Sequence, residues 1–263
     1  MPFFPGMGYP LVPGYETAGV VLDNRVSKKL KVGDYVFVPG ANCYENVKGL
    51  FGASSSLLIA SDTKLIKIDP ELKAKGTLFA LAATARHAIA GLGNKLPSLI
   101  IGHGVLGRLL ARLTIAAGGE PPIVWESNPL RADRQTDYEV IDPARDNSSD
   151  HEAIYEASGD VGVLDKIIPK LKKNGEIVFA GFYSSPISFS FPPAFMKEAR
   201  FRISAEFNTE DINITKSLLE TGALSLEGLV SHEKSANFSK AAYRQSFEDP
   251  ECLKMVIDWR DAA

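Results

Sequence analysis

Apolar residues follow two different patterns along the chain, and the change comes near residue 70. Before that point, short runs of β-branched and aromatic residues are separated by Gly, Asp, Asn and Pro, which is typical of strands in a barrel or sandwich. The Gly33-Asp34 pair predicts a turn that leads into one of these strands. Strands are predicted at residues 17–23, 34–40, 55–60 and 64–69.

After residue 76, helical and extended patterns alternate. Residues 77–93 predict a helix that ends in glycines suited to a C-terminal cap. Short apolar strands that alternate with helices are typical of an α/β protein with a doubly wound parallel sheet. Strands are predicted at residues 98–102, 121–127, 138–142, 152–159, 176–182 and 200–207, and helices at 105–119 and 161–175.

The last predicted strand of this sheet, at 200–207, alternates more than the others and is expected at an edge. The charged stretch 142–151 is expected to be a solvated loop. The end of the chain predicts a helix over 209–222 with Gly222 as its stop, and then a helix and a final strand within 238–259.

The composition fits a soluble globular protein of one large or two medium domains: 263 residues, 45% hydrophobic and 23% charged, with a mean hydropathy of −0.03. A net charge of −3 argues against binding to nucleic acid, which usually requires a basic face. No apolar run reaches the roughly 18 residues of a membrane span, and the N-terminus lacks signal-peptide features. Cys43 and Cys252 are too few for a disulfide framework or a four-thiolate zinc site. We expect a cytoplasmic protein.

A glycine-rich turn fits the pattern G-x-G-x-x-G and lies between a predicted strand and a predicted helix. The first glycine of this pattern allows a tight turn, the second lets the backbone approach a pyrophosphate, and the third permits close contact between helix and strand. The helix N-terminus offers unpaired N–H groups to the anion. The candidate cofactor-binding residues of this turn are Gly102, His103, Gly104, Val105, Leu106 and Gly107.

An acidic residue follows the next predicted strand. Glu126 lies 19 residues after Gly107, close to the roughly 20 expected for the carboxylate that binds the ribose 2′-OH. A carboxylate there repels a 2′-phosphate, so Glu126 favours NAD over NADP. Two alternatives stay open: Glu126 is a solvent-facing residue at a strand end, or Arg131 serves a phosphate if its loop turns back. His103 is expected to be an exposed loop imidazole near the phosphates.

Two more strand ends in the predicted sheet carry small residues. Ligands of open α/β sheets bind at the carboxyl ends of strands. Ser158, Gly159, Gly181 and Phe182 are therefore expected to approach the ribose and nicotinamide of the cofactor. The alternative is that these glycines are ordinary strand-to-loop residues.

The chain has a β-rich region, then a domain with the glycine-rich turn, then a short return segment. This order resembles the medium-chain dehydrogenase/reductase superfamily, and the resemblance covers essentially the whole chain. It implies a Rossmann NAD-binding domain at residues 81–209 and a GroES-like β-rich catalytic region at 1–80 and 210–263. Residues 2–19 resemble most the members that oxidise the 3-hydroxyethyl group of a chlorophyllide or bacteriochlorophyllide to acetyl with NAD. The segments that carry the superfamily resemblance are 9–21, 30–38, 81–89, 100–113, 172–182 and 218–259.

Two departures from the superfamily are informative. Zinc members carry Gly-His-Glu where this chain has Gly14-Tyr15-Glu16, and no cysteine ligand stands near residues 80–83. A catalytic zinc needs about three protein ligands, so we expect no catalytic metal. The chain also begins almost at this motif, where the superfamily has several more strands, so we expect the N-terminal part of the barrel to be missing.

Without zinc, a side chain or a water relay must take the proton of the alcohol. The resemblance implies three candidates on segments that face the cleft, Tyr15, Glu16 and His87, and a nicotinamide contact for Thr84. Each candidate has a structural alternative. The alternatives are that Tyr15 fills the vacated metal pocket, that Glu16 holds the glycine turn by backbone hydrogen bonds, and that His87 is an ordinary core or surface histidine.

A tetrapyrrole substrate needs a wide apolar slot. One wall is expected from Phe3, Phe4, Met7 and Tyr9 and another from residues 182–196, although both stretches can equally pack in a core or interface. Arg86 and Lys48 are candidate partners for the macrocycle carboxylates. We expect a homodimer that pairs through residues 200–207. The rival hypotheses are a zinc-free quinone or enone reductase that uses NADPH, and a non-catalytic nucleotide-binding protein.

Overall fold

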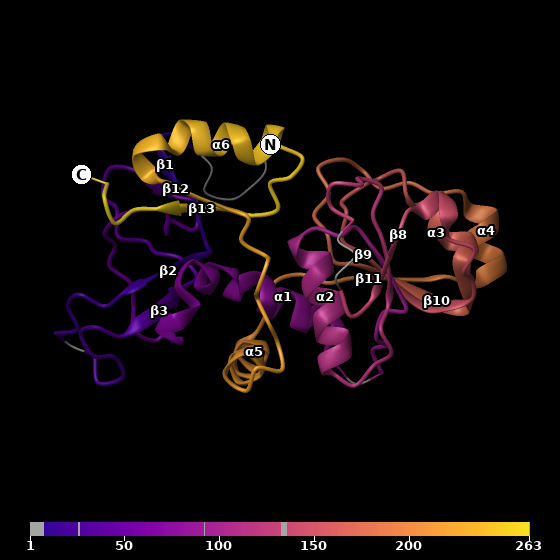
Figure 1. The fold of residues 1–263 in the computed structure, drawn as a ribbon, viewed down its shortest axis with the longest axis horizontal. Coiled ribbons are helices and arrows are strands. Elements are labelled where there is room, and N and C mark those ends of the chain that lie inside the picture. Colours follow the sequence, from indigo (N-terminus) through magenta and orange to yellow (C-terminus); the bar gives the residue numbers. More distant parts are fainter. Residues whose placement is uncertain (1–7, 26, 92, 133–135, 263) are drawn as a thin grey trace. The chain divides into compact units, whose positions relative to one another are not determined.

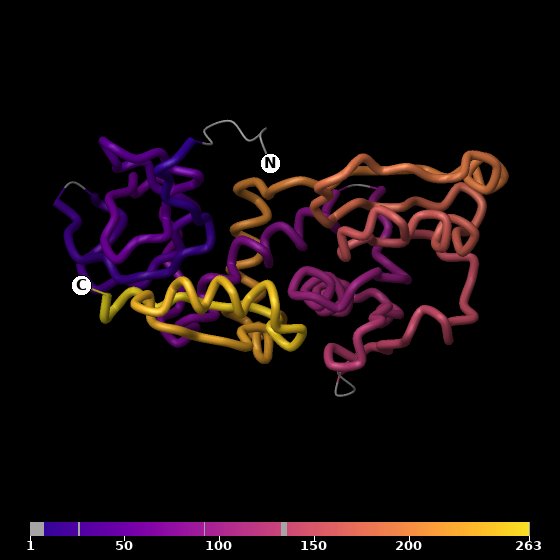
Figure 2. The backbone as a smooth tube through the Cα atoms, turned by 90° about the horizontal axis from the view of Figure 1, so that it is seen from above, coloured from indigo at the N-terminus to yellow at the C-terminus, as the bar shows by residue number. Residues whose placement is uncertain are grey.

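The computed structural model describes residues 8–25, 27–91, 93–132 and 136–262, and they form two compact units. Unit 1 consists of Met1–Ala80 and Leu226–Ala263, and unit 2 of Leu81–Ser225. The chain leaves unit 1, builds unit 2 and returns to unit 1, as the colour sequence in Figure 2 shows. The second boundary thus follows Ser225 rather than residue 209, because helix α5 (Thr209–Glu220) belongs to unit 2.

Unit 1 is built from short strands. Strands β2 (Thr17–Val20), β3 (Tyr35–Val38) and β5 (Ile66–Lys67) form an antiparallel sheet in the order β2-β3-β5. The Gly33-Asp34 turn precedes β3 as expected, with Gly33 at φ +91°. Two parallel pairs complete the strands of this unit: β1 (Leu11–Val12) with β4 (Lys48–Gly49), and β12 (His232–Ser235) with β13 (Met255–Asp258).

One helical segment lies where the chain leaves unit 1, and another helix lies in the part of the chain that returns to unit 1. A 3-10 helix (Pro70–Leu78), capped by the side chain of Asp69, leads into helix α1 (Phe79–Ile89). Helix α6 (Ser239–Glu248) connects β12 to β13 and packs on both (Figure 1). The helix expected at 77–93 is therefore present over part of its range.

The strand predicted at residues 55–60 is absent from the described structure. The backbone N–H of Ser55 bonds to Ala53 in a tight local turn, and Leu57 and Ile59 are exposed. An apolar run forms a strand only where a neighbouring strand pairs with it, and this run has no such neighbour among the described residues.

Unit 2 contains a six-stranded parallel sheet (Figure 1). Its order, β11-β10-β9-β6-β7-β8, is the one typical of dinucleotide-binding folds, in which the chain reverses direction across the sheet between β6 and β9. Strand β11 lies at an edge, which confirms the expectation for this segment. The strands are β6 (Leu99–Ile101), β7 (Ile123–Trp125), β8 (Glu139–Ile141), β9 (His151–Glu156), β10 (Leu171–Phe179) and β11 (Arg200–Ile203).

The helices of unit 2 are α2 (Val105–Ala116), α3 (Leu164–Ile167), α4 (Phe191–Lys197) and α5, together with most of α1. The helix predicted over 161–175 is wrong beyond residue 170, where β10 begins. Pro169 cannot continue the helical hydrogen bonds. Leu164, Ile167, Ile168 and Leu171 are all buried in one cluster, so the helix-like spacing reflects burial by a short helix followed by a strand.

Candidate cofactor and active site

The glycine turn has the geometry that its sequence predicts. Gly102 has φ +97°, a left-handed conformation that favours glycine. A Cβ on Gly107 would lie 1.9 Å from the carbonyl oxygen of Gly102, so only glycine lets helix α2 pack this closely on β6. A Cβ on Gly104 would instead meet open space.

Helix α2 begins directly after Gly104, which is its N-cap and provides no capping side chain. The first N–H groups of such a helix have no intrahelical acceptor and attract anions. The open space at Gly104 lies at this same helix end. The turn therefore fits the pyrophosphate of a dinucleotide, held by backbone groups of residues 102–107.

Glu126 follows β7 beside the glycine turn. One oxygen of its carboxylate accepts the N–H of Asn128 at 2.7 Å and the other accepts the N–H of His103 at 3.3 Å. A cavity of about 820 Å³ opens at the carboxyl ends of β7 and β8. Its lining residues include Glu126, Ser127, Tyr138, Ile141 and Asp142. A carboxylate and a cavity at this sheet edge fit the adenosine end of a dinucleotide.

His103 is fully buried, so the expectation of an exposed imidazole is wrong. Its Nδ1 lies 2.7 Å from the carbonyl oxygen of Arg131, and its Nε2 lies 2.9 Å from the hydroxyl of Tyr138. A carbonyl accepts only, so Nδ1 carries the proton and Nε2 accepts from the tyrosine. The Arg108 guanidinium also donates to the Arg131 carbonyl, at 3.1 Å. The loop after Glu126 thus turns back onto the glycine turn through the Arg131 backbone.

Glu156 lies among the predicted cofactor residues, although it was not itself among the residues expected from the sequence. It ends β9 and is fully buried, and its carboxylate accepts from Ser158, Gly159 and Tyr183. Burial raises the pKa of this carboxyl, against hydrogen bonds from Ser158 and Gly159 that lower it. The predicted cofactor residues Ser158, Gly159, Gly181 and Phe182 lie on the two loops around it.

Tyr15 and Glu16 lie in unit 1. The Tyr15 ring is partly exposed and packs edge-on against Phe51, with ring centroids 5.0 Å apart. Burial, and then the neighbouring Glu16 charge, raise the pKa of the Tyr15 phenol. The Glu16 carboxylate forms an ion pair with the Lys254 ammonium, and its Oε1 is buried without a hydrogen-bond partner among the described residues. No local sequence signal links Glu16 to Lys254.

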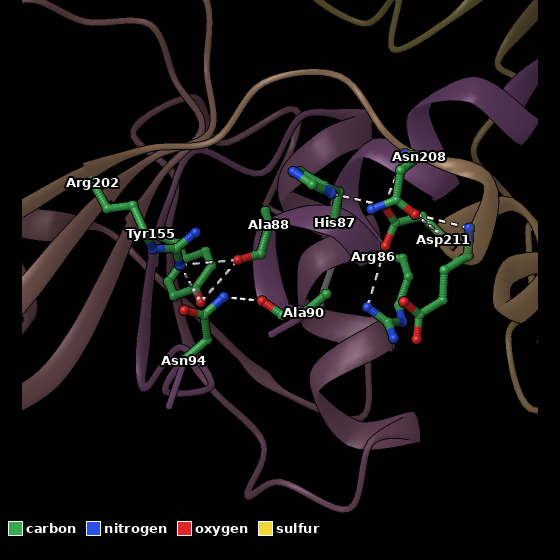
Figure 3. Close-up of polar contacts among 10 residues, drawn as sticks. Arg86, His87, Ala88, Ala90, Asn94, Tyr155, Arg202, Asn208 and Asp211 are labelled. Carbon is green, nitrogen blue, oxygen red and sulfur yellow. Dashed lines mark hydrogen bonds and ion pairs between the residues drawn. The ribbon is translucent and has the colours of Figure 1, made fainter. Parts of the chain in front are cut away.

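His87 and Arg86 on α1 both contact Asp211, the third residue of α5 (Figure 3). His87 Nδ1 lies 2.7 Å from one carboxylate oxygen of Asp211, and an Arg86 guanidinium nitrogen lies 3.3 Å from the other. Asp211 also completes a capping box with Asn208 at the start of α5. These contacts join α1 to α5 and explain why α5 belongs to unit 2. Thr84 lies one turn before His87 on α1 and is partly buried.

A second polar cluster holds the last turn of α1, close to the first cluster in the sequence, and Figure 3 shows both clusters. The buried Tyr155 hydroxyl donates to the carbonyl oxygen of Lys95 at 2.8 Å and lies 3.2 Å from that of Ala88. The Arg202 guanidinium donates to the Ala88 carbonyl at 3.0 Å. Burial raises the pKa of Tyr155 to about 12, so its hydroxyl remains a donor.

The described residues contain no group of three or more His, Cys, Asp or Glu side chains that could hold a metal ion. Cys43 and Cys252 are free thiols. Glu16, which follows the position of the expected histidine ligand, is paired with Lys254. The donor set among the described residues therefore does not fit the zinc site of the superfamily.

The expected substrate walls are only partly described. Phe3, Phe4 and Met7 lie outside the described residues, and Tyr9 is exposed. Lys48 is also exposed. The second wall includes exposed apolar side chains: Phe182, Ile187, Phe189, Phe191, Phe195 and Met196.

Two curated relatives match the chain from end to end. The 2-desacetyl-2-hydroxyethyl bacteriochlorophyllide A dehydrogenase of Rhodobacter capsulatus is 54% identical over 263 residues, which are 100% of this chain and 84% of the relative. The enzyme of the same name from Cereibacter sphaeroides is 55% identical over 268 residues, again 100% and 84%. The chain belongs to this dehydrogenase family. It is an oxidoreductase that acts on CH–OH groups. No protein-family model matches the chain.

Solved structures of several dehydrogenases share the fold. The 2R,3R-butanediol dehydrogenase of Bacillus subtilis superposes with a TM-score of 0.80 at 18% identity, over 96% of this chain and 82% of that one. An alcohol dehydrogenase of Escherichia coli solved with NADH has a TM-score of 0.78 at 16% identity, over 96% and 85%. A dehydrogenase of Sinorhizobium meliloti bound to NADP has a TM-score of 0.76 at 16% identity, over 97% and 84%.

The dehydrogenase relatives and these cofactor-bound neighbours indicate a nicotinamide cofactor for the chain. No helix in the described part of the chain is long and apolar enough to cross a bilayer.

Proposed function

We propose that this chain oxidises the 3-(1-hydroxyethyl) side chain of a bacteriochlorophyllide to an acetyl group, using NAD, as a step of bacteriochlorophyll biosynthesis. The observation that carries this proposal is the 54% identity over all 263 residues to a dehydrogenase named for that hydroxyethyl substrate. The glycine turn, with its open space at Gly104, supports the cofactor half of the proposal.

The reaction removes two electrons and two hydrogens from the substrate. NAD, when bound, supplies the nicotinamide C4 that accepts the hydride from the carbinol carbon. The hydroxyl proton leaves to a base, and the carbon–oxygen bond becomes the carbonyl of the acetyl group. This product is conjugated with the macrocycle, which favours the oxidation.

Glu16 is the general base of this proposal, with Tyr15 beside it in the chain as a hydrogen-bonding group for the substrate hydroxyl. The Glu16 Oε1 is a buried acceptor without a partner among the described residues, whereas Oε2 is held by Lys254. The raised pKa of Tyr15 keeps its phenol protonated, which suits a donor better than a base. His87 is the third candidate, and its contact with Asp211 favours a structural role.

NAD is favoured over NADP because the Glu126 carboxylate lies at the end of β7 beside the glycine turn. A 2′-phosphate brought to this carboxylate would meet a like charge. Zinc independence is supported by the donor set around Tyr15, Glu16 and Lys254, in which a lysine ammonium already compensates the carboxylate.

A homodimer through β11 is also part of the proposal. Strand β11 is one of the two edge strands of the sheet, and an unpaired edge is a template for another strand. Exposed apolar side chains surround it, including Ile203 with 79% of its side chain exposed and the stacked rings of Phe189 and Phe201, 4.9 Å apart. Apolar patches of this kind mark protein interfaces.

The deciding experiment follows NADH formation with 3-hydroxyethyl bacteriochlorophyllide, simple secondary alcohols and quinones as alternative substrates, each with and without a metal chelator. Turnover of the bacteriochlorophyllide with NAD, undiminished by chelator, is the expected result. Loss of activity with the chelator would contradict zinc independence. A preference for NADPH with quinones would favour a reductase instead.

A further inference from the structure

Glu156 occupies the centre of the sheet edge where a dinucleotide is expected to bind. It is the last residue of β9 and pairs in register with Ile101 of β6 on one side and Phe179 of β10 on the other. The chain reverses direction across the sheet between β6 and β9, and ligands bind at such points in open α/β sheets. The Glu156 side chain is nevertheless fully buried.

One oxygen of this carboxylate organises the loop after β9. Glu156 Oε1 accepts the backbone N–H of Ser158 at 2.7 Å and that of Gly159 at 3.2 Å, and it also accepts the Ser158 hydroxyl. Gly159 has φ +73°, so the loop turns sharply at the residue that the carboxylate holds. The loop is thereby fixed from its buried side while Ser158 remains exposed.

The other oxygen holds the loop after β10. Glu156 Oε2 accepts the hydroxyl of Tyr183, and the Glu156 carbonyl accepts the N–H groups of Ala180 and Gly181, both at 2.9 Å. A Cβ on Gly181 would lie 3.3 Å from Glu156 Oε2 and 3.2 Å from the Gly159 nitrogen. The two loops are thus packed against each other around one carboxylate.

Burying an ionised carboxylate is costly unless donors surround it. Here the donors come from two loops that carry the expected nicotinamide-side residues, Ser158, Gly159, Gly181 and Phe182. We propose that Glu156 is a positioning residue for the nicotinamide half of the cofactor site: it sets the separation of these two loops. The inference rests on the proposed use of a nicotinamide cofactor.

The test compares NADH with 5′-AMP, which lacks the nicotinamide half. Dissociation constants of both are measured for the wild type, Glu156→Gln, Tyr183→Phe and a control, Glu152→Gln. Glu152 lies on the same strand, is exposed, and pairs with Lys95 and Lys172 on the surface. Thermal unfolding of each variant reports whether it is folded.

We expect Glu156→Gln to weaken NADH binding about tenfold, because the donors of the two loops lose a carboxylate acceptor. We expect Tyr183→Phe, which removes one donor only, to weaken it about threefold. AMP affinity is expected to stay at the wild-type value in both variants. The control variant is expected to bind both ligands like the wild type.

Unchanged NADH affinity in both Glu156→Gln and Tyr183→Phe would overturn the proposal. So would a parallel loss of AMP affinity, which would mean a general structural defect. If Glu156→Gln does not fold, Tyr183→Phe decides by the same comparison. Binding is measured without the alcohol substrate, so the two proposals can fail separately. If the variants lose NADH affinity as expected but the wild type does not oxidise the bacteriochlorophyllide, the proposed substrate is contradicted and the role of Glu156 is supported.

Discussion

The carboxylate of Glu16 forms an ion pair with the ammonium of Lys254, a residue 238 positions away in the sequence. Both side chains are mostly buried, with 21% and 17% of their surface exposed. The pair joins the segment that carries the proposed base to the residue just before strand β13. It leaves Glu16 Oε1 as a buried acceptor without a partner among the described residues.

Replacement of Glu16 tests its role as the base. Glu16→Gln keeps the size of the side chain but removes its basicity, so kcat for alcohol oxidation is expected to fall about 10²-fold or more. NADH affinity is expected to stay unchanged. Steady-state kinetics and NADH titration check this, and a variant with wild-type kcat would rule out Glu16 as the base.

Replacement of Lys254 tests the ion pair itself. Lys254→Met leaves a largely buried carboxylate without its cation, and the free energy of unfolding is expected to drop by roughly 1–3 kcal/mol after allowance for partial exposure. Lys254→Arg retains the charge and is the matched control. Denaturant unfolding of the three proteins measures the effect, and equal stability of Lys254→Met and the wild type would show that the pair contributes little.

Replacement of Glu126 tests cofactor choice. Glu126→Ala removes the carboxylate that accepts from His103 and Asn128, and NAD affinity is expected to fall about tenfold while NADP affinity changes less. Discrimination between the two cofactors therefore shrinks. Glu139→Gln, an exposed change that lines the same cavity, is the control. Tighter binding of NADP than NAD by the wild type would contradict the role given to Glu126.

The surface cluster around Glu152 predicts a pH effect on stability. Hydrogen bonds from Lys95 and Lys172 lower the pKa of this carboxyl to about 2 from its ordinary 4.5. Because the folded pKa lies below the unfolded one, the stabilisation is present above pH 4.5 and is lost as the pH falls toward 2. Glu152→Gln is expected to be slightly less stable than the wild type near neutral pH and equally stable at the acid limit. Unfolding curves at several pH values check this, and added salt is expected to reduce the difference.

A charge on the sheet edge tests the dimer. Ile203→Lys places an ammonium on the exposed edge strand β11 and is expected to shift the protein from dimer to monomer in light scattering. Phe247→Lys changes an exposed apolar residue of α6 and is the control, expected to remain dimeric. A monomeric wild type would refute assembly through β11.

Local sequence signals were sufficient where the physical constraint is itself local. Gly102 is required by its positive φ and Gly107 by a 1.9 Å approach to the Gly102 carbonyl oxygen, and both constraints lie within a few residues of the turn. Glu126 was predicted as a cofactor residue because a parallel strand after the turn places its end at a nearly constant spacing, and it does lie beside the glycine turn. The edge position of 200–207 was readable from its alternation.

Where a structure depends on contact between distant segments, the predictions from local sequence were wrong or gave no signal. Residues 55–60 have the composition of a strand but no strand neighbour in the described structure. Residues 161–175 have helical spacing, yet Pro169 ends the helix and the same buried positions are reached by a strand. His103 was expected in solvent because Tyr138, which covers it, lies 35 residues away.

The amino-acid sequence by itself determined the strand–turn–helix that we propose as the cofactor site, because backbone conformation and hydrophobic periodicity act over a few residues. Only the tertiary structure decided which charges are compensated: Glu16 by Lys254, Asp211 by Arg86 and His87, and Glu156 by the donors of two loops. Each of these carboxylates has at least one partner from a distant segment, Tyr183 in the case of Glu156, and such partners become neighbours only when the sheet and helices pack.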